Sequence, residues 1–141
     1  MSTDAVPPAE AGLVRALRVV LEAHPAVQVV YLFGSRARGE ARKDSDVDVA
    51  VLGKITDALT LLADLEEAAA RPVDLVLLRS APVELAARVV QEGVRLLVRD
   101  EVARVRHHAE VLDRYFDTEP MRAILARGQA IRLQEDRFGR R

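Results

Sequence analysis

The stretch that decides this chain is Gly34-Ser35, ten further residues, and then Asp46-Val47-Asp48. Gly34 and Ser35 follow a run of apolar residues. A turn after a buried strand directs backbone N–H groups outward, where they favour an anion. Asp46 and Asp48 are two residues apart, so on a β-strand both carboxylates project from one face. The stretch therefore places a phosphate-sized loop a fixed distance before two carboxylates, which suits a metal–nucleoside triphosphate site.

Each half of this stretch also has a simpler interpretation when it is taken alone. Gly34 lets the backbone approach a ligand because it has no Cβ, and the Ser35 hydroxyl can donate to a phosphate oxygen. A Gly-Ser pair after a strand is nevertheless more often only a turn. An isolated Asp-x-Asp is more often a polar strand start, with Asp46 as a turn residue. The functional interpretation depends on the two halves occurring together.

A third carboxylate lies inside another apolar run. Asp74 is the second residue of the run 73–78, where a charge is costly without a partner. If this strand neighbours the one that carries Asp46 and Asp48, the three carboxylates lie close together. Three carboxylates can hold two metal ions, or two can hold metal while Asp74 acts as a general base. The alternative is that Asp74 sits at an exposed strand end.

Composition excludes several classes of protein. A chain of 141 residues, 50% hydrophobic and 30% charged, is long enough for one domain with its own core. Its 21 Lys and Arg nearly balance its 22 Asp and Glu, so we expect no direct nucleic-acid binding and no membrane partner. It has no cysteine, which excludes disulfides and Cys-based zinc sites. Without a signal peptide or an apolar span, a cytoplasmic location is expected.

The hydrophobic pattern predicts an α/β (α+β) fold in which helices flank one mixed β-sheet. Strands have short apolar runs and helices have apolar residues every three or four positions. Helices are expected at 9–23, 55–70 and 82–93, and strands at 26–33, 47–52, 73–78 and 94–98. Residues 9–98 would form the domain, and 100–141 a helical C-terminal extension with helices at 100–116 and 121–131 and fraying at 137–141.

The C-terminal extension carries an apolar stripe. The stripe is Val102, Val105, Ala109, Leu112 and Phe116, at helical spacing. It is either intramolecular core, the more common case, or a face for a helical partner.

The basic patch is Arg36, Arg38, Arg42 and Lys43. It is either a solvated face, or Arg36 or Arg38 reaches bound phosphates.

Gly34-Ser35-x10-Asp46-x-Asp48 together with Asp74 resembles the minimal nucleotidyltransferase domain, a small relative of DNA polymerase β and kanamycin nucleotidyltransferase. The resemblance covers about residues 14–98. It implies a nucleotidyltransferase-like mixed sheet with ATP and Mg²⁺ at the site. Gly34 and Ser35 would hold the triphosphate, and Asp46 and Asp48 would bind the metal. Asp74 would complete the metal site and help activate the acceptor hydroxyl.

Small domains of this kind resemble the antitoxin halves of prokaryotic HEPN–MNT toxin–antitoxin pairs, and residues 115–122 also resemble the tail of such antitoxins. The resemblance implies AMP transfer from ATP to a hydroxyl, expected to be a tyrosine, of a HEPN ribonuclease toxin, which is thereby silenced. Two alternatives remain at this stage. One is a non-catalytic antitoxin that acts by stoichiometric binding, and the other is a nucleotidyltransferase for small molecules of the aminoglycoside type.

Overall fold

The computed structural model describes residues 6–127, which form one sheet and the helices around it. A single turn of 3-10 helix, η1 (Pro8–Glu10), leads into the first helix, and a second, η2 (Leu78–Ser80), follows the third strand. Residues 119–127 are helical again after a turn at Thr118. The other elements are α1 (Ala11–Glu22), β1 (Val27–Phe33), β2 (Val47–Gly53), α2 (Ala58–Ala69), β3 (Val73–Leu77), α3 (Val83–Glu92), β4 (Val94–Val98) and α4 (Glu101–Asp117).

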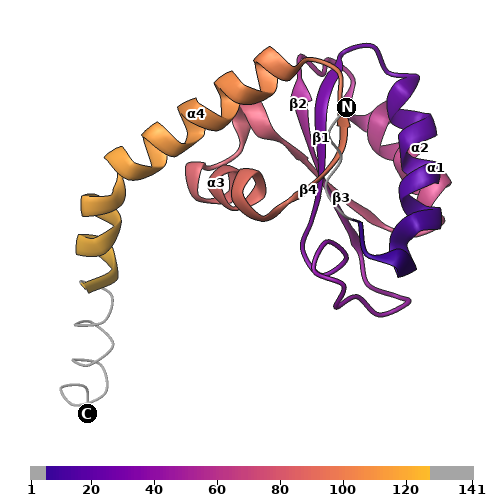
Figure 1. The fold of residues 1–141 in the computed structure, drawn as a ribbon, viewed down its shortest axis with the longest axis horizontal. Helices are drawn as coiled ribbons and strands as arrows, with labels where there is room; N and C mark the ends of the chain where they lie inside the picture. The colour runs from indigo at the N-terminus through magenta and orange to yellow at the C-terminus, as the bar shows by residue number, and fades with distance from the viewer. Residues whose placement is uncertain (1–5, 128–141) are drawn as a thin grey trace.

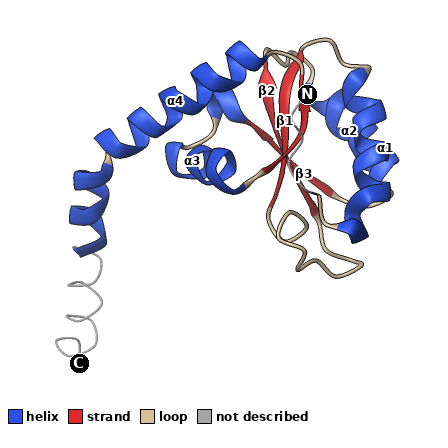
Figure 2. Ribbon diagram, in the orientation of Figure 1, coloured by secondary structure: helices blue, strands red, loops and turns tan. Residues whose placement is uncertain are grey.

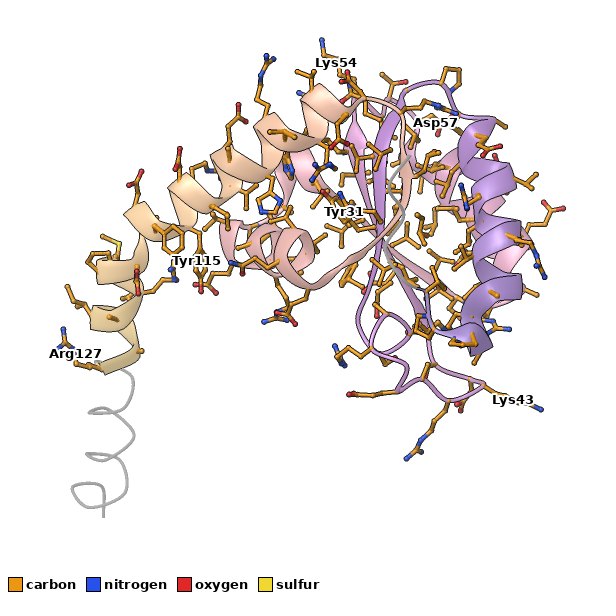
Figure 3. All side chains as sticks on the ribbon, viewed as in Figure 1. Tyr31, Lys43, Lys54, Asp57, Tyr115 and Arg127 are labelled. Atoms are coloured by element: carbon orange, nitrogen blue, oxygen red, sulfur yellow. The ribbon has the colours of Figure 1, made fainter. Side chains whose placement is uncertain are left out.

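The sheet is mixed and has helices on both faces, as the sequence predicts. Its strand order is β3-β2-β1-β4, in which β1 is antiparallel to both β2 and β4, while β3 is parallel to β2. Helices α1 and α2 cover one face, and α3 and α4 cover the other (Figures 1 and 2). The loop 34–46 leaves one end of the sheet between β1 and β2, with Lys43 near its outer end (Figure 3).

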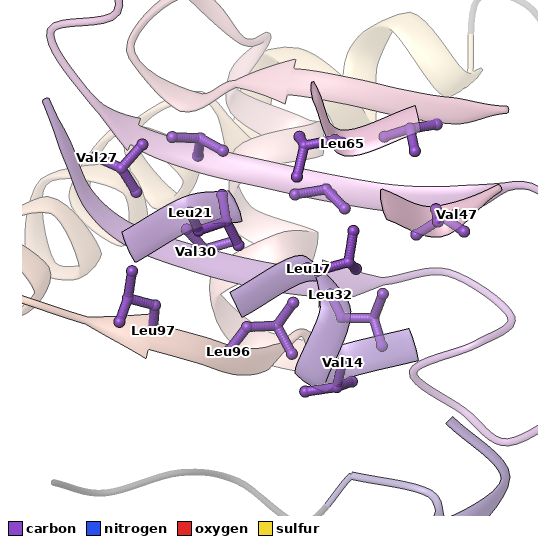
Figure 4. Close-up of a cluster of buried hydrophobic side chains, with 14 of the residues drawn as sticks. Val14, Leu17, Leu21, Val27, Val30, Leu32, Val47, Leu65, Leu96 and Leu97 are labelled. Atoms are coloured by element: carbon purple, nitrogen blue, oxygen red, sulfur yellow. The ribbon is translucent and has the colours of Figure 1, made fainter. Parts of the chain in front are cut away.

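Side chains alternate between two hydrophobic clusters, one on each face of the sheet. Val47 and Val49 of β2 belong to the cluster beneath α1 and α2, part of which is drawn in Figure 4. Ala50 belongs to the cluster beneath α3 and α4. Asp48 lies between Val47 and Val49 in the strand, so its side chain projects toward the α3 side. The sequence-based assignment of these faces is confirmed.

The strands agree with the sequence-based boundaries to within a residue, and the helices differ mainly at their ends. The helix expected from residue 55 begins at Ala58, because the Asp57 side chain accepts a hydrogen bond from the Thr60 N–H and caps it. The interruption expected at 117–120 is confined to a turn at Thr118. The end of the predicted helix 121–131, beyond residue 127, and the predicted fraying at 137–141 lie outside the described residues.

The apolar stripe of α4 is left largely uncovered by the rest of the described chain. Val102 is 65% exposed, Val105 52% and Phe116 56%. The helix packs on the domain through a neighbouring row instead, with Val111 buried in the cluster beneath α3 and α4. These three side chains are therefore not part of the core that residues 6–127 form. The domain limits 9–98 and 100–141 stay a prediction.

None of the helices within residues 6–127 combines the length and the apolar character needed to cross a bilayer.

Candidate active site

The two strands that carry Asp48 and Asp74 are neighbours, and the two residues are register partners. β2 and β3 run parallel with Asp48 opposite Asp74, so both side chains project from the same face. Asp46 immediately precedes β2 and is two residues from Asp48, which places it at the same edge. The structure thus brings together the three carboxylates that the sequence singled out.

The electrostatics of Asp48 reflect this crowding. Burial raises the pKa of its carboxyl above 3.8, and the charges of Asp74 and Asp46 raise that pKa further. A side-chain hydrogen bond with Asp74 favours the protonated form of Asp48, so it also raises the pKa. Only the nearby Arg38 guanidinium lowers it. Carboxylates held this close repel each other, and a bound cation would relieve that repulsion.

The Gly-Ser loop is in contact with this carboxylate group. Gly34 directly follows β1, whose last residue Phe33 pairs with Asp48 in the sheet. The backbone of Gly34 has a φ of +76°, a conformation that side chains disfavour. A Cβ on Gly34 would lie 2.2 Å from the Oδ2 atom of Asp48. Glycine is therefore required here, both by the turn and by the close approach of the carboxylate.

Replacing Gly34 with Ala is expected to destabilise the protein by about 2 kcal/mol, because the new Cβ both strains the backbone and displaces Asp48. We expect ATP binding to weaken in the same variant. Urea unfolding and calorimetric titration with ATP measure the two effects. Gly12→Ala is the matched control: it lies in α1 with nothing within 4 Å of its added Cβ, so it should not destabilise the protein. Unchanged stability and ATP affinity of Gly34→Ala would contradict this account of the loop.

The structure gives Arg36 a different role from the one expected. Arg36 is only 3% exposed, and its Nη1 atom donates to both carboxylate oxygens of Glu10, at 2.6 and 3.0 Å. Its Nη2 atom donates to the backbone carbonyls of Arg42, Lys43 and Ser45, at 3.3, 3.3 and 2.6 Å. The prediction that Arg36 holds the triphosphate does not agree with this placement, because the side chain is buried and both of its Nη atoms donate within the protein.

Arg36 instead fixes the loop that leads to the carboxylates. Its bond to the Ser45 carbonyl lies one residue before Asp46, so the guanidinium determines where the chain enters β2. This partner could not be predicted from the sequence, because Glu10 is 26 residues away at the start of the first helix. Of the two arginines considered for phosphate binding, Arg38 is the one beside the site.

A cavity of about 400 Å³ connects the loop to the carboxylate edge. Two of its lining residues, Arg88 and Glu92, come from α3 and were not anticipated. They are four residues apart on one helix, so they lie on the same face. This spacing is the only feature of the sequence that links the two residues to each other. The other lining residues are Phe33, Gly34, Ser35, Ala37, Arg38 and Asp48.

The donor atoms at this edge are those that a hard divalent cation prefers. Asp48 and Asp74 supply carboxylate oxygens that already share a hydrogen bond, and Asp46 is close enough to raise the Asp48 pKa. Within residues 6–127, no group of three or more His, Cys, Asp or Glu side chains is arranged as a metal site. It is the chemistry of the carboxylate donors that fits Mg²⁺.

Comparison with known proteins supports the same site. Residues 16–102, more than half of the chain, match the family model described as polymerase beta, nucleotidyltransferase. The chain belongs to the polymerase beta nucleotidyltransferase family. Gly34, Ser35 and the three aspartates of this nucleotidyltransferase all fall within the matched residues. The resemblance drawn from the sequence and the predicted fold class are confirmed.

Among curated proteins, this nucleotidyltransferase is similar to the protein adenylyltransferase MntA of Shewanella oneidensis, with 42% identity over 76 residues. The match covers 51% of this chain and 55% of MntA, so the chain spans about half the length of that relative.

Two solved structures have the same fold. One is a crystal structure of a toxin–antitoxin with AMP-PNP, with a TM-score of 0.74 and 28% identity over 83% of this chain and 98% of the other. The second contains a tri-AMPylated Shewanella oneidensis HEPN toxin in complex with an MNT antitoxin, with a TM-score of 0.68 and 26% identity over 84% and 96% of the two chains.

Proposed function

We propose that this protein transfers AMP from ATP to a hydroxyl group, expected to be a tyrosine side chain, of a partner HEPN toxin, and that it thereby acts as the antitoxin. The observation that carries this proposal is the contact between the Gly34 loop and the paired carboxylates of Asp48 and Asp74. The related structures, one with AMP-PNP and one with a tri-AMPylated toxin, support the same chemistry. We place the reaction in the cytoplasm, as the sequence predicts.

In this reaction the acceptor oxygen attacks the α-phosphorus of ATP. The α-phosphorus loses its bond to the oxygen that bridges the α- and β-phosphates. Pyrophosphate leaves with the electrons of that bond. Asp74 is exposed at the edge of the sheet and is suited to accept the proton of the acceptor hydroxyl. Holding the two reactants in line accounts for much of the expected rate enhancement.

The loop and the carboxylates would divide the binding of the nucleotide between them. Backbone N–H groups at Gly34 and the Ser35 hydroxyl would bind phosphate oxygens, and the exposed Arg38 would add a positive charge. Asp46, Asp48 and Asp74 would hold Mg²⁺, which when bound neutralises the charge on the attacking and leaving oxygens.

Labelled ATP tests this proposal directly. The chain is incubated with Mg²⁺ and a purified HEPN toxin from the same organism, using ATP labelled at the α- or at the γ-phosphate. We expect the α-label on the HEPN protein, none of the γ-label, and pyrophosphate as the second product. Neutralisation of the toxin without any label would instead identify a stoichiometric antitoxin. Label on an aminoglycoside and not on the HEPN protein would identify a small-molecule enzyme.

A further inference from the structure

A groove between α3 and the helical residues 119–127 is outside the site described so far. Its volume is about 550 Å³. One wall is the polar face of α3, formed by Glu84, Arg88, Gln91 and Glu92. These residues are spaced by three and four positions, so they lie on one side of the helix. Tyr115, Arg122, Leu125 and Ala126 form the opposite wall, and Figure 3 shows Tyr115 between α4 and α3.

The opposite wall is held in place by Arg122. Its guanidinium lies 3.7 Å from the centre of the Tyr115 ring, which is a cation–π contact. Its Nε atom lies 3.9 Å from a carboxylate oxygen of Glu84 on α3. Arg122 therefore connects the helical end of the described chain to both sides of the groove, which makes the groove a built feature of the fold.

The groove is next to the cavity beside the Gly34 loop. Arg88 and Glu92 line both, so the same face of α3 forms a wall of each. A group bound in the groove would thus lie next to the Gly34 loop and Asp48. A site for the acceptor of AMP has to be this near, because the acceptor oxygen must meet the α-phosphorus directly.

The helical segments that form the opposite wall also carry exposed apolar side chains, here called the apolar rim, of which Leu125 lines the groove itself. Met121 is 65% exposed, Ile124 60% and Leu125 55%, and Phe116 on the preceding turn is 56% exposed. Four large apolar side chains exposed within ten residues are typical of a protein interface. A small polar acceptor such as an aminoglycoside would gain little from such a rim, whereas a folded protein would bury it.

We propose that this groove and its apolar rim, formed by Phe116, Met121, Ile124 and Leu125, dock the partner toxin and deliver its acceptor hydroxyl to the nucleotide. The proposal rests on the proposed function for the identity of the partner. The rim supplies the contact area, and the polar face of α3 orients the acceptor segment toward Asp48 and Asp74. The specificity for one toxin therefore lies in α3 and residues 116–125, outside the nucleotide site.

The test places a charge in the rim. Leu125→Arg is expected to weaken binding of the same HEPN toxin by at least about 30-fold, because a charge in the centre of an interface is buried without a partner. Affinity for Mg²⁺–ATP should not change. Calorimetry measures both. Leu59→Arg on α2 is the matched control: Leu59 is 80% exposed and lies on the opposite side of the sheet (Figure 1), so binding should stay within about twofold of wild type.

Two further outcomes separate this proposal from the proposed function. If the wild-type chain binds the HEPN protein but transfers no AMP, the proposed function fails. The binding data for the variants still show whether the groove is the docking site. If Leu125→Arg and Ile124→Arg both bind the HEPN protein as tightly as wild type, the groove is not its docking site, whatever the transfer assay shows. Failure of the wild-type chain to bind the HEPN protein would also overturn the docking proposal.

Discussion

Replacing Asp48 with Asn is expected to lower the rate of AMP transfer by about 10³-fold or more, which corresponds to about 4 kcal/mol of transition-state stabilisation. Asn keeps the size of the side chain but removes the negative charge. The variant therefore loses the central carboxylate of the group formed with Asp46 and Asp74, and with it the expected Mg²⁺ ligand. Transfer of α-labelled AMP to the HEPN protein measures the loss.

The same substitution should not destabilise the fold. The pKa of Asp48 is higher in the folded protein than in the unfolded chain, so protonation of this carboxyl stabilises the fold. This contribution to the free energy of unfolding is fully present below about pH 3.8 and is lost as the pH rises through the pKa of the folded state. At neutral pH the ionised carboxylate therefore destabilises the protein, and Asp48→Asn removes that repulsion. Because the group is only partly buried and solvent screens the repulsion, we expect a gain of at most about 1 kcal/mol, seen as a slightly higher Tm without Mg²⁺.

Asp44→Asn is the matched control for this prediction, because Asp44 is exposed in the loop before β2, does not line the cavity and is not among the groups that shift the Asp48 pKa. It should transfer AMP at the wild-type rate. Wild-type transfer by Asp48→Asn would remove the carboxylates from the mechanism. A strong loss of stability in Asp48→Asn would show that the carboxylate supports the fold rather than the chemistry.

Replacing Glu10 with Ala is expected to lower the free energy of unfolding by about 3 kcal/mol, because it leaves the Arg36 guanidinium buried without a counter-charge. The side chains of Glu10 and Arg36 are 7% and 4% exposed, and their shortest bond is 2.6 Å. Urea unfolding measures the loss. AMP transfer should also fall under conditions where the protein is still folded, because Arg36 positions the residues leading to Asp46.

A second Glu–Arg pair in the same loop provides the control. Glu40 pairs with Arg38 at 3.2 Å, but the two side chains are 64% and 52% exposed. Glu40→Ala should therefore change stability by less than about 0.5 kcal/mol, as is usual for ion pairs in solvent. Equal effects of Glu10→Ala and Glu40→Ala would contradict the structural role given to the buried pair.

The sheet and the carboxylates were predictable because their signals are local. The alternation of Val47, Val49 and Val51 with Asp48 fixes which face of the strand is polar, and this needs no knowledge of the rest of the fold. Placing Asp74 beside Asp48 required one assumption, that the two strands are neighbours, and the parallel pairing of β2 and β3 confirms it.

The roles of Arg36, Arg88 and Glu92 were not predictable, because each depends on a segment distant in sequence. Arg36 and Arg38 are alike in sequence, and only the packing of Glu10 against the loop decides which of them is buried. Arg88 and Glu92 reach the site because α3 crosses the sheet beside the Gly34 loop. The helix predicted at 100–116 is present as α4, but its most apolar row, which includes Val102 and Val105, is exposed. The row that packs on the domain includes Val111.

Calorimetric titration of the chain with ATP, in the presence and absence of Mg²⁺, tests the central claim most directly. If the Gly34 loop and the aspartates form one nucleotide site, ATP binds tightly only with Mg²⁺, and Asp48→Asn or Asp74→Asn weakens that binding at least tenfold. Equal ATP affinity with and without Mg²⁺, unchanged in both variants, would contradict it.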